Sequence, residues 1–265
     1  MMPLYSEIYV DSVVERFVKK LWCLDNSANS NISKDMMLLP NGCFNFGIVQ
    51  GEGLEVCFNA GKYSLEKGHY LCSQVTEKAL VKIKPFTKII FIQLHAWTLS
   101  YISDVDFSNH INKVFRSDQI SFSSHFDLKF NTTDLNEIVN EVNNIFKDLN
   151  IKYPEKGIVE EISTSLKTNK IPVTNIINKV SSKSTRATQI KFKRSTGMTI
   201  KEYSSIMNFR DSVDGIKEAK DTNKLTCLAL DYGYYDQSHY THMFKKIVGI
   251  TPKEFDPKSF ILSKN

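Results

Sequence analysis

The chain has 265 residues, of which 42% are hydrophobic and 24% charged, a composition typical of a globular protein with two domains of ordinary size. The net charge of +5 is uneven, because residues 171–265 hold 16 Lys and Arg against 9 Asp and Glu, whereas residues 1–170 hold 18 against 20. No apolar run approaches the roughly 18 residues of a membrane helix, and no basic-then-apolar leader is visible, so we expect a cytoplasmic protein that does not enter the membrane.

The five cysteines are widely spaced, and no two of them form a C-x-x-C pair. An odd number at such spacing argues against a disulfide framework and against a structural zinc site. We expect them to serve as small apolar side chains in a reducing compartment. They are Cys23, Cys43, Cys57, Cys72 and Cys227.

The first predicted elements are five short strands. Each is an apolar or alternating run, and turn-forming residues such as Pro40-Asn41-Gly42 and Lys84-Pro85 separate them. Several short strands at this spacing indicate an antiparallel barrel or sandwich. The runs are 36–39, 43–49, 54–58, 79–83 and 88–94.

Helical periodicity replaces the strand pattern near residue 131. A stripe of Leu135, Ile138, Val142, Ile145 and Leu149 predicts a helix over 134–149, with Asp134 as its N-cap and Glu137 completing a capping box. This stripe has two interpretations: it packs on the barrel, or it pairs with a second copy in a homodimer. A second helix is predicted over 156–167. We place the domain boundary after it, which gives domains of 1–168 and 169–265.

A repeated unit marks the C-terminal part. Residues 192–203 align with residues 244–255 at an offset of 52, with six of twelve positions identical. In each copy a phenylalanine on the inner face of a helix precedes a glycine, Gly197 or Gly249, that closes the helix. A second helix is expected after each glycine, so the unit is predicted to be helix, turn, helix. Its capping residues are Thr199 with Glu202, and Thr251 with Glu254 and Pro252.

The second copy has a readable upstream half. The inner face of a short helix is predicted to hold Leu225, Leu228 and Ala229. Gly233 is expected to supply the turn, and Asp236 to cap a second helix that runs to about Val248. Tyr240, Met243, Phe244 and Ile247 share the inner side of this helix. The residues predicted to contact DNA are Gln237, Ser238, His239, Thr241, His242, Lys245 and Lys246.

The stretch from Ala229 to Phe255 resembles the signature of AraC/XylS transcription regulators. The matching features are the small Ala229, the Gly233-Tyr234 turn, the Tyr240-x-x-x-Phe244-Lys245 spacing and the Gly249-x-Thr251-Pro252 ending. The resemblance implies an activator that binds double-stranded DNA and works through RNA polymerase. It does not imply an enzyme, and none of the five cysteines has the Pro-Cys-His setting of a DNA repair methyltransferase.

The first copy departs from the family pattern. Thr188 stands where a leucine is expected, Asn178 or Ile177 where an alanine is expected, and Ile190 where a basic residue is usual. This unit therefore either reads bases, with Ile190 touching a thymine methyl, or contributes phosphate contacts only. Its predicted DNA-facing residues are Ser184, Arg186, Gln189, Ile190, Lys193 and Arg194.

In the family, a long helix joins the two units. Here it is expected from Thr199 to about Ala219, and it would place two reading helices about one DNA turn (~34 Å) apart. Its inner residues are predicted to be Ile206, Phe209 or Arg210, Val213 and Ile216. The predicted fold is therefore α+β with two domains. The first is an antiparallel barrel or sandwich with helices, and the second is an all-α domain with two helix-turn-helix units.

Residues 40–44, following Glu15-Arg16-Phe17 and Trp22, resemble the cupin-like sensor half of some of these regulators. The resemblance implies a small-molecule effector or, alternatively, a protein partner. Trp22, Phe44, Tyr70 and Trp97 are candidates to line a pocket. The histidines His69, His95, His110 and His125 form no H-x-H pair, so we predict neither a metal nor a cofactor and no cupin-type catalysis.

Overall fold

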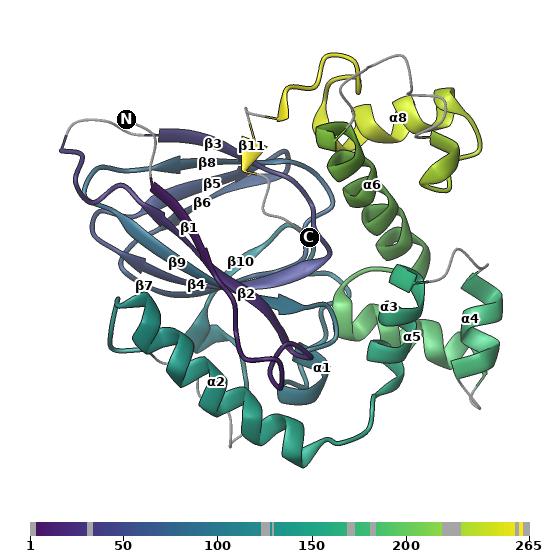
Figure 1. Ribbon diagram of the computed structural model, residues 1–265, viewed down its shortest axis with the longest axis horizontal. Helices are drawn as coiled ribbons and strands as arrows, with labels where there is room; N and C mark the ends of the chain where they lie inside the picture. The colour runs from purple at the N-terminus through teal and green to yellow at the C-terminus, as the bar shows by residue number, and fades with distance from the viewer. Residues whose placement is uncertain are drawn as a thin grey trace.

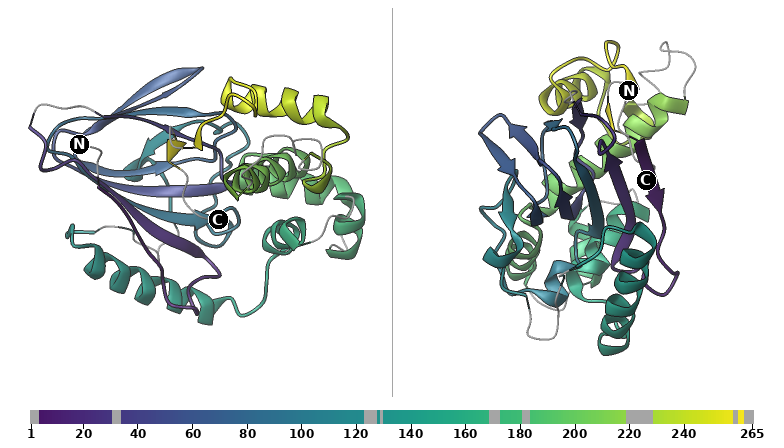
Figure 2. Two further views of the ribbon diagram at one scale, coloured as in Figure 1. Left: turned by 45° about the horizontal axis from the view of Figure 1, so that its top comes forward. Right: turned by 90° about the vertical axis from the view of Figure 1, so that its left-hand side faces the viewer.

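The computed structural model describes residues 4–30, 34–122, 128, 130–168, 173–180, 184–218, 229–257 and 260–261. Two packed β-sheets form the N-terminal part, and the helices of the C-terminal part gather beside one end of them (Figures 1 and 2). The predicted α+β arrangement of an antiparallel N-terminal part and a helical C-terminal part is confirmed. Within the described ranges, no helix is both long enough and apolar enough to span a membrane.

The larger sheet is antiparallel throughout, in the order β1-β2-β9-β4-β7-β10. Central strand β9 is buried on both faces because alternate residues enter different cores. Ile90 and Ile92 face helix α2, whereas Ile89 and Phe91 face the smaller sheet. The strands are β1 (Leu4–Ile8), β2 (Val18–Asp25), β4 (Cys43–Gln50), β7 (Gly68–Cys72), β9 (Lys88–His95) and β10 (Val114–Arg116).

The smaller sheet has the order β11-β3-β8-β5-β6, and the far C-terminus contributes to it. Strand β11 (Phe260–Ile261) pairs in parallel with β3 (Lys34–Leu38), so the chain returns to the N-terminal part after its last helix. This strand is an exception to the predicted all-α C-terminal part. The remaining strands are β5 (Leu54–Phe58), β6 (Gly61–Leu65) and β8 (Ala79–Ile83).

The packing of helix α2 (Leu135–Lys152) distinguishes between the two interpretations of its apolar stripe. Ile138, Val142, Phe146 and Leu149 are buried in the same core as the larger sheet, so the stripe packs on the barrel. Asp134 caps the helix by accepting hydrogen bonds from the N–H groups of residues 136 and 137, whereas the Glu137 carboxylate bonds to the Thr132 hydroxyl rather than closing a capping box.

The helical part contains α3 (Ile158–Thr168), α4 (Val173–Val180), α5 (Thr185–Thr196), α6 (Ile200–Glu218) and α8 (Gln237–Val248). Helix α3, assigned from the sequence to the N-terminal domain, packs against α4, α5 and α6. A short helix, α1 (Leu99–Ile102), and a 3-10 turn, η1 (Ser117–Gln119), lie in the N-terminal part. The predicted positions Leu225, Leu228 and His125 lie outside the described residues.

One predicted helix is wrong. Thr251 and Glu254 make the expected capping contacts, with the Thr251 N–H donating to the Glu254 carboxylate at 2.8 Å, but only a single turn follows. Pro257 disfavours a helical conformation at Asp256, so the helix cannot continue and the chain turns toward β3. In the first copy, where no proline intervenes, the equivalent helix is α6.

Candidate nucleic-acid interface

The second unit is built around the turn before α8. Gly233 has a φ of +80°, and the Tyr234 N–H donates to the Ala229 carbonyl at 2.9 Å, which closes the turn after the helical residues 229–231. Asp236 then caps α8 by accepting a hydrogen bond from the His239 N–H at 2.7 Å. The orientation of α8 is therefore fixed at its N-terminal end, which is the end that approaches base edges in a major groove.

Helix α8 has two distinct faces. Tyr240, Phe244 and Ile247 are buried in the helical core, and Met243 is partly buried beside them. The predicted DNA-facing residues lie on the other side. Gln237, Ser238, His239, His242, Lys245 and Lys246 are exposed, and Thr241 is half-buried.

The first unit, α4 with α5, has the same plan with altered packing. Ser184 caps α5 by accepting from the Ala187 N–H at 3.3 Å, and Thr188 and Phe192 are buried. Ile177 of the first unit corresponds to Ala229 of the second, and Thr188 corresponds to Tyr240. The first unit therefore has its larger inner residue on the first helix and the smaller on the second, whereas the second unit has the reverse. The size exchange explains how both units fill their cores despite the unusual Thr188.

The outward residues of α5 differ in their surroundings. Ser184, Arg186, Gln189 and Ile190 are exposed, and Lys193 is half-buried. Arg194 is exposed but already engaged, because its Nε lies 3.0 Å from the Asp106 carboxylate of the N-terminal part. Ile190, at 50% exposure, is one of few large apolar side chains on the surface of the described structure.

Helix α6 holds both units. The Phe192 ring of α5 packs edge-on against Tyr203 near the start of α6, with the ring centroids 5.7 Å apart. The Phe244 ring of α8 packs against Phe209 further along, at 5.4 Å. A helix of 19 residues is about 28 Å long, so α6 separates the two reading helices while fixing them to one rigid element (Figure 1).

Tyr235 is an exposed residue that the sequence analysis did not select. It directly precedes the α8 cap, and its side chain is 87% exposed, the most of the large apolar residues described. An exposed aromatic residue at the N-terminal end of α8 is a further candidate for contact with a partner molecule. The sequence signal for this residue is its place directly before the Asp236 cap.

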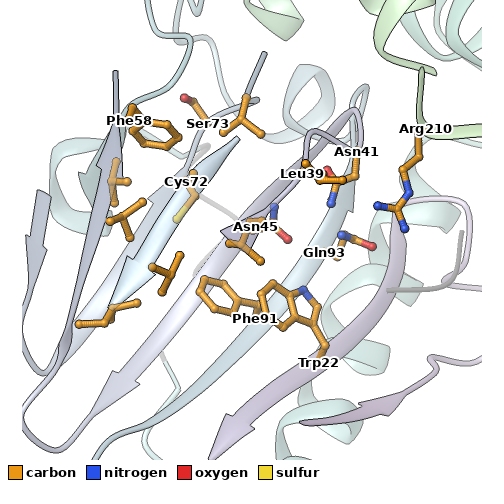
Figure 3. Close-up of a pocket in the computed structure, with 17 residues that line it drawn as sticks. Trp22, Leu39, Asn41, Asn45, Phe58, Cys72, Ser73, Phe91, Gln93 and Arg210 are labelled. Carbon is orange, nitrogen blue, oxygen red and sulfur yellow. The ribbon is translucent and has the colours of Figure 1, made fainter. Parts of the chain in front are cut away.

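The N-terminal part contains a cavity between its two sheets (Figure 3). Trp22 and Phe91 stack at its wall with centroids 4.3 Å apart, whereas Asn45 and Gln93, directly opposite each other on β4 and β9, form a polar band. The Gln93 amide and the Asn45 carbonyl are buried without a hydrogen-bond partner among the described residues. Of the predicted aromatic lining, only Trp22 reaches this cavity. Phe44 and Tyr70 belong to the cores, and Trp97 stacks on His95.

Arg210 connects this cavity to the helical part. It projects from α6 toward the edge of the cavity, beside Asn41 and above Gln93 (Figure 3), and its side chain is almost entirely buried. Burial lowers the pKa of the guanidinium. The Asp214 carboxylate, 3.5 Å away, opposes this shift because it favours the charged form. The helix that joins the two units therefore places a positive charge inside the N-terminal part.

Residues 171–257 match the sequence profile of a helix-turn-helix domain family, so the predicted AraC-type helix-turn-helix domain is confirmed in this part of the chain. The search among curated proteins found no match.

Among solved structures, the chain is similar to ToxT from Vibrio cholerae O395, with 12% identity, 84% of this chain and 95% of that chain covered, and a TM-score of 0.45. It is also similar to ToxT from strain SCE256 with an unsaturated fatty acid bound, at 11% identity, 84% and 93% coverage and a TM-score of 0.44.

Proposed function

We propose that this chain, whose residues 171–257 form an AraC-type helix-turn-helix domain, is a sequence-specific transcription regulator that reads two adjacent major-groove segments. One observation carries the proposal: α5 and α8 each expose a polar, basic face while burying a phenylalanine against the single helix α6. Two reading helices on one rigid support are suited to one face of a duplex.

The two reading helices have different roles in this proposal. On α8, His242 and Thr241 reach base edges while Lys245 and Lys246 contact phosphates. On α5, Arg186 and Gln189 near the N-terminal end read bases, and Ile190 packs on a thymine methyl. The net positive charge of residues 171–265 supports the phosphate contacts.

We further propose that the N-terminal part is a sensor domain that binds a small-molecule effector in the cavity between its sheets. The stacked Trp22 and Phe91 offer an apolar surface, and the unpartnered Asn45 Oδ1 and Gln93 side-chain amide offer hydrogen bonds. Arg210 adds a positive charge at the mouth. These features together favour an amphipathic molecule with an apolar body and an anionic head.

Arg210 connects the proposed effector site to the DNA-binding part. An effector bound to the guanidinium contacts α6 directly, and both reading helices are fixed to α6. The sensor also touches α6 at Gly42, where a Cβ atom would lie 2.7 Å from the Met207 sulfur and 3.1 Å from the Tyr203 ring. Contacts this tight transmit a displacement of α6 rather than absorbing it.

The proposal that this chain is an activator includes two further partners, RNA polymerase and a second copy of this chain. RNA polymerase is the partner implied by the AraC-type domain, and multiple-round transcription with purified polymerase from a promoter carrying the selected site would test it. A homodimer through α2 would have to use the polar outer face of this helix, because its apolar stripe is buried against the larger sheet.

Selection of duplexes from a random DNA pool tests the central proposal. We expect an enriched motif with two conserved segments, bound at least roughly 10³-fold more tightly than random duplex. Binding should weaken steeply as salt rises, since phosphate contacts displace counterions. Equal affinity for enriched and random DNA at every salt concentration would contradict sequence-specific recognition.

A further inference from the structure

A loop of the sensor, residues 103–108, lies beside the first reading helix. A groove separates the two, lined by Ala187, Ile190 and Lys191 of α5 on one side and by Ser103, Asp104 and Val105 on the other. Ile190 is one of the residues assigned to DNA contact, so part of the DNA-facing side of α5 opens onto this groove. The sensor loop therefore lies beside the face of α5 that is assigned to DNA contact.

Two contacts hold the loop to the last turn of α5. The Asp106 carboxylate lies 3.0 Å from the Arg194 Nε, and the Phe107 N–H donates to the Arg194 carbonyl at 2.8 Å. Phe107 is buried in the sensor core and packs on Phe44, so the loop is anchored at its base. One residue of α5 is thus bound through both its side chain and its backbone.

Asp106 is kept in its charged form. The Ser108 hydroxyl and the Ser108 N–H, the latter at 2.9 Å, donate hydrogen bonds to its carboxylate and hold its pKa below the ordinary range, and Arg194 adds to the effect. Asp106 therefore presents a fixed negative charge to Arg194 at neutral pH.

Among the described residues, the second reading helix contacts the sensor through a backbone hydrogen bond and not through an ion pair. Its hydrogen bond to the sensor runs from the Lys78 N–H to the Ile247 carbonyl at 3.0 Å, and the Lys78 amine lies near Gly249. Within the described ranges, no carboxylate forms an ion pair with the basic residues of α8. The sensor thus neutralises a cation on one reading helix and leaves those on the other available.

We propose that residues 103–108 form an autoinhibitory contact in which Asp106 competes with a DNA phosphate for Arg194. The inference rests on the proposed DNA-binding function. While Asp106 neutralises the Arg194 guanidinium and holds its Nε, the side chain is a weaker partner for a phosphate, so the first unit engages DNA more tightly once the loop releases it. Both side chains are about half exposed, at 59% and 47%, which makes the ion pair weak enough for DNA to break.

The test compares Kd values of the full-length chain for its selected duplex by fluorescence anisotropy. Asp106→Asn keeps the shape of the side chain but removes the charge, and we expect it to tighten binding roughly two- to fivefold. The gain should shrink as salt rises, because salt screens the ion pair. Asp104→Asn is the matched control: it removes the same charge from the same loop, and we expect a smaller gain.

Arg194→Ala completes a double-mutant cycle. We expect it to weaken binding and to abolish the gain from Asp106→Asn, because no guanidinium is left to release. Equal gains from Asp104→Asn and Asp106→Asn, or an Asp106→Asn gain that persists in Arg194→Ala, would overturn the autoinhibitory contact while leaving DNA binding intact. If none of these proteins prefers the selected duplex, the proposed function itself fails.

Discussion

Gly197 and Gly249 close the two reading helices in the same way. Their φ angles are +83° and +85°, and their N–H groups donate to the carbonyls of Lys193 and Lys245 at 2.7 and 2.8 Å. Their surroundings differ. A Cβ atom on Gly197 would lie 3.0 Å from the Phe107 backbone oxygen, whereas one on Gly249 would meet the flexible end of Lys78 at 2.9 Å.

This difference predicts unequal effects of the same substitution. Gly249→Ala should destabilise the chain by about 1 kcal/mol, because an alanine is strained at positive φ but the lysine tip can move away. Gly197→Ala should cost more, since a backbone carbonyl cannot give way as easily. The free energy of unfolding from urea titrations measures both effects. Equal losses, or a larger loss at Gly249, would show that Phe107 does not pack against this turn.

The second reading helix should show separable contributions from base and phosphate contacts. Lys245→Ala should weaken binding to all duplexes alike and reduce the salt slope of log K by about 0.9, the value for one lost phosphate contact. His242→Ala should instead relax the base preference at one position of the selected motif. Lys147→Ala, which removes an exposed lysine from α2, is the control and should leave both quantities unchanged.

The cavity should distinguish anionic from neutral ligands. Thermal-shift titration with 4-phenylbutyrate should stabilise the chain more than the matched 4-phenylbutyramide, because only the acid pairs with Arg210. Arg210→Met should remove this difference. Asn45→Leu should weaken both ligands, since it removes an unpartnered carbonyl and fills part of the site. If the amide and the acid stabilise the native chain equally, Arg210 does not recognise the ligand.

Strand β11 should hold the second unit to the sensor. Phe260 is buried and packs on Phe255 at 4.8 Å, and its neighbour pairs with Leu38. Deleting residues 258–265 should expose the edge of β3, so its amides should exchange with deuterium faster. Phe260→Ala, which keeps the backbone pairing, should have a smaller effect. Unchanged exchange in the truncated chain would mean that the tail does not protect β3.

The sequence predicted those elements whose signals are local. Strands such as β5 and β8 alternate or stay apolar over their whole length, and the glycine and capping residues of the repeat define α5 and α8. The sequence does not predict strand β2, because Lys19 and Lys20 interrupt its apolar pattern. Lys20 is nevertheless fully buried, since its amine pairs with Glu7 of the adjacent strand at 2.9 Å. That partner is visible only once the sheet has formed.

The candidate site likewise contains residues that local sequence signals predict and residues that depend on tertiary packing. The exposed polar side of α8 follows from periodicity, since Tyr240 and Phe244 must face inward. Arg210 could be placed on the inner side of the linker helix, but its entry into the sensor cavity depends on how the two parts pack. The engagement of Arg194 by Asp106 likewise joins segments 88 residues apart. No local pattern encodes such contacts.

Hydroxyl-radical footprinting on the selected duplex tests the central claim most directly. Two reading helices fixed to α6 should protect two short windows on one face of the DNA, about one helical turn apart. His242→Ala with Lys245→Ala should erase one window, and Arg186→Ala with Gln189→Ala the other. A single protected window that both pairs of substitutions weaken together would contradict the proposal that α5 and α8 read separate segments.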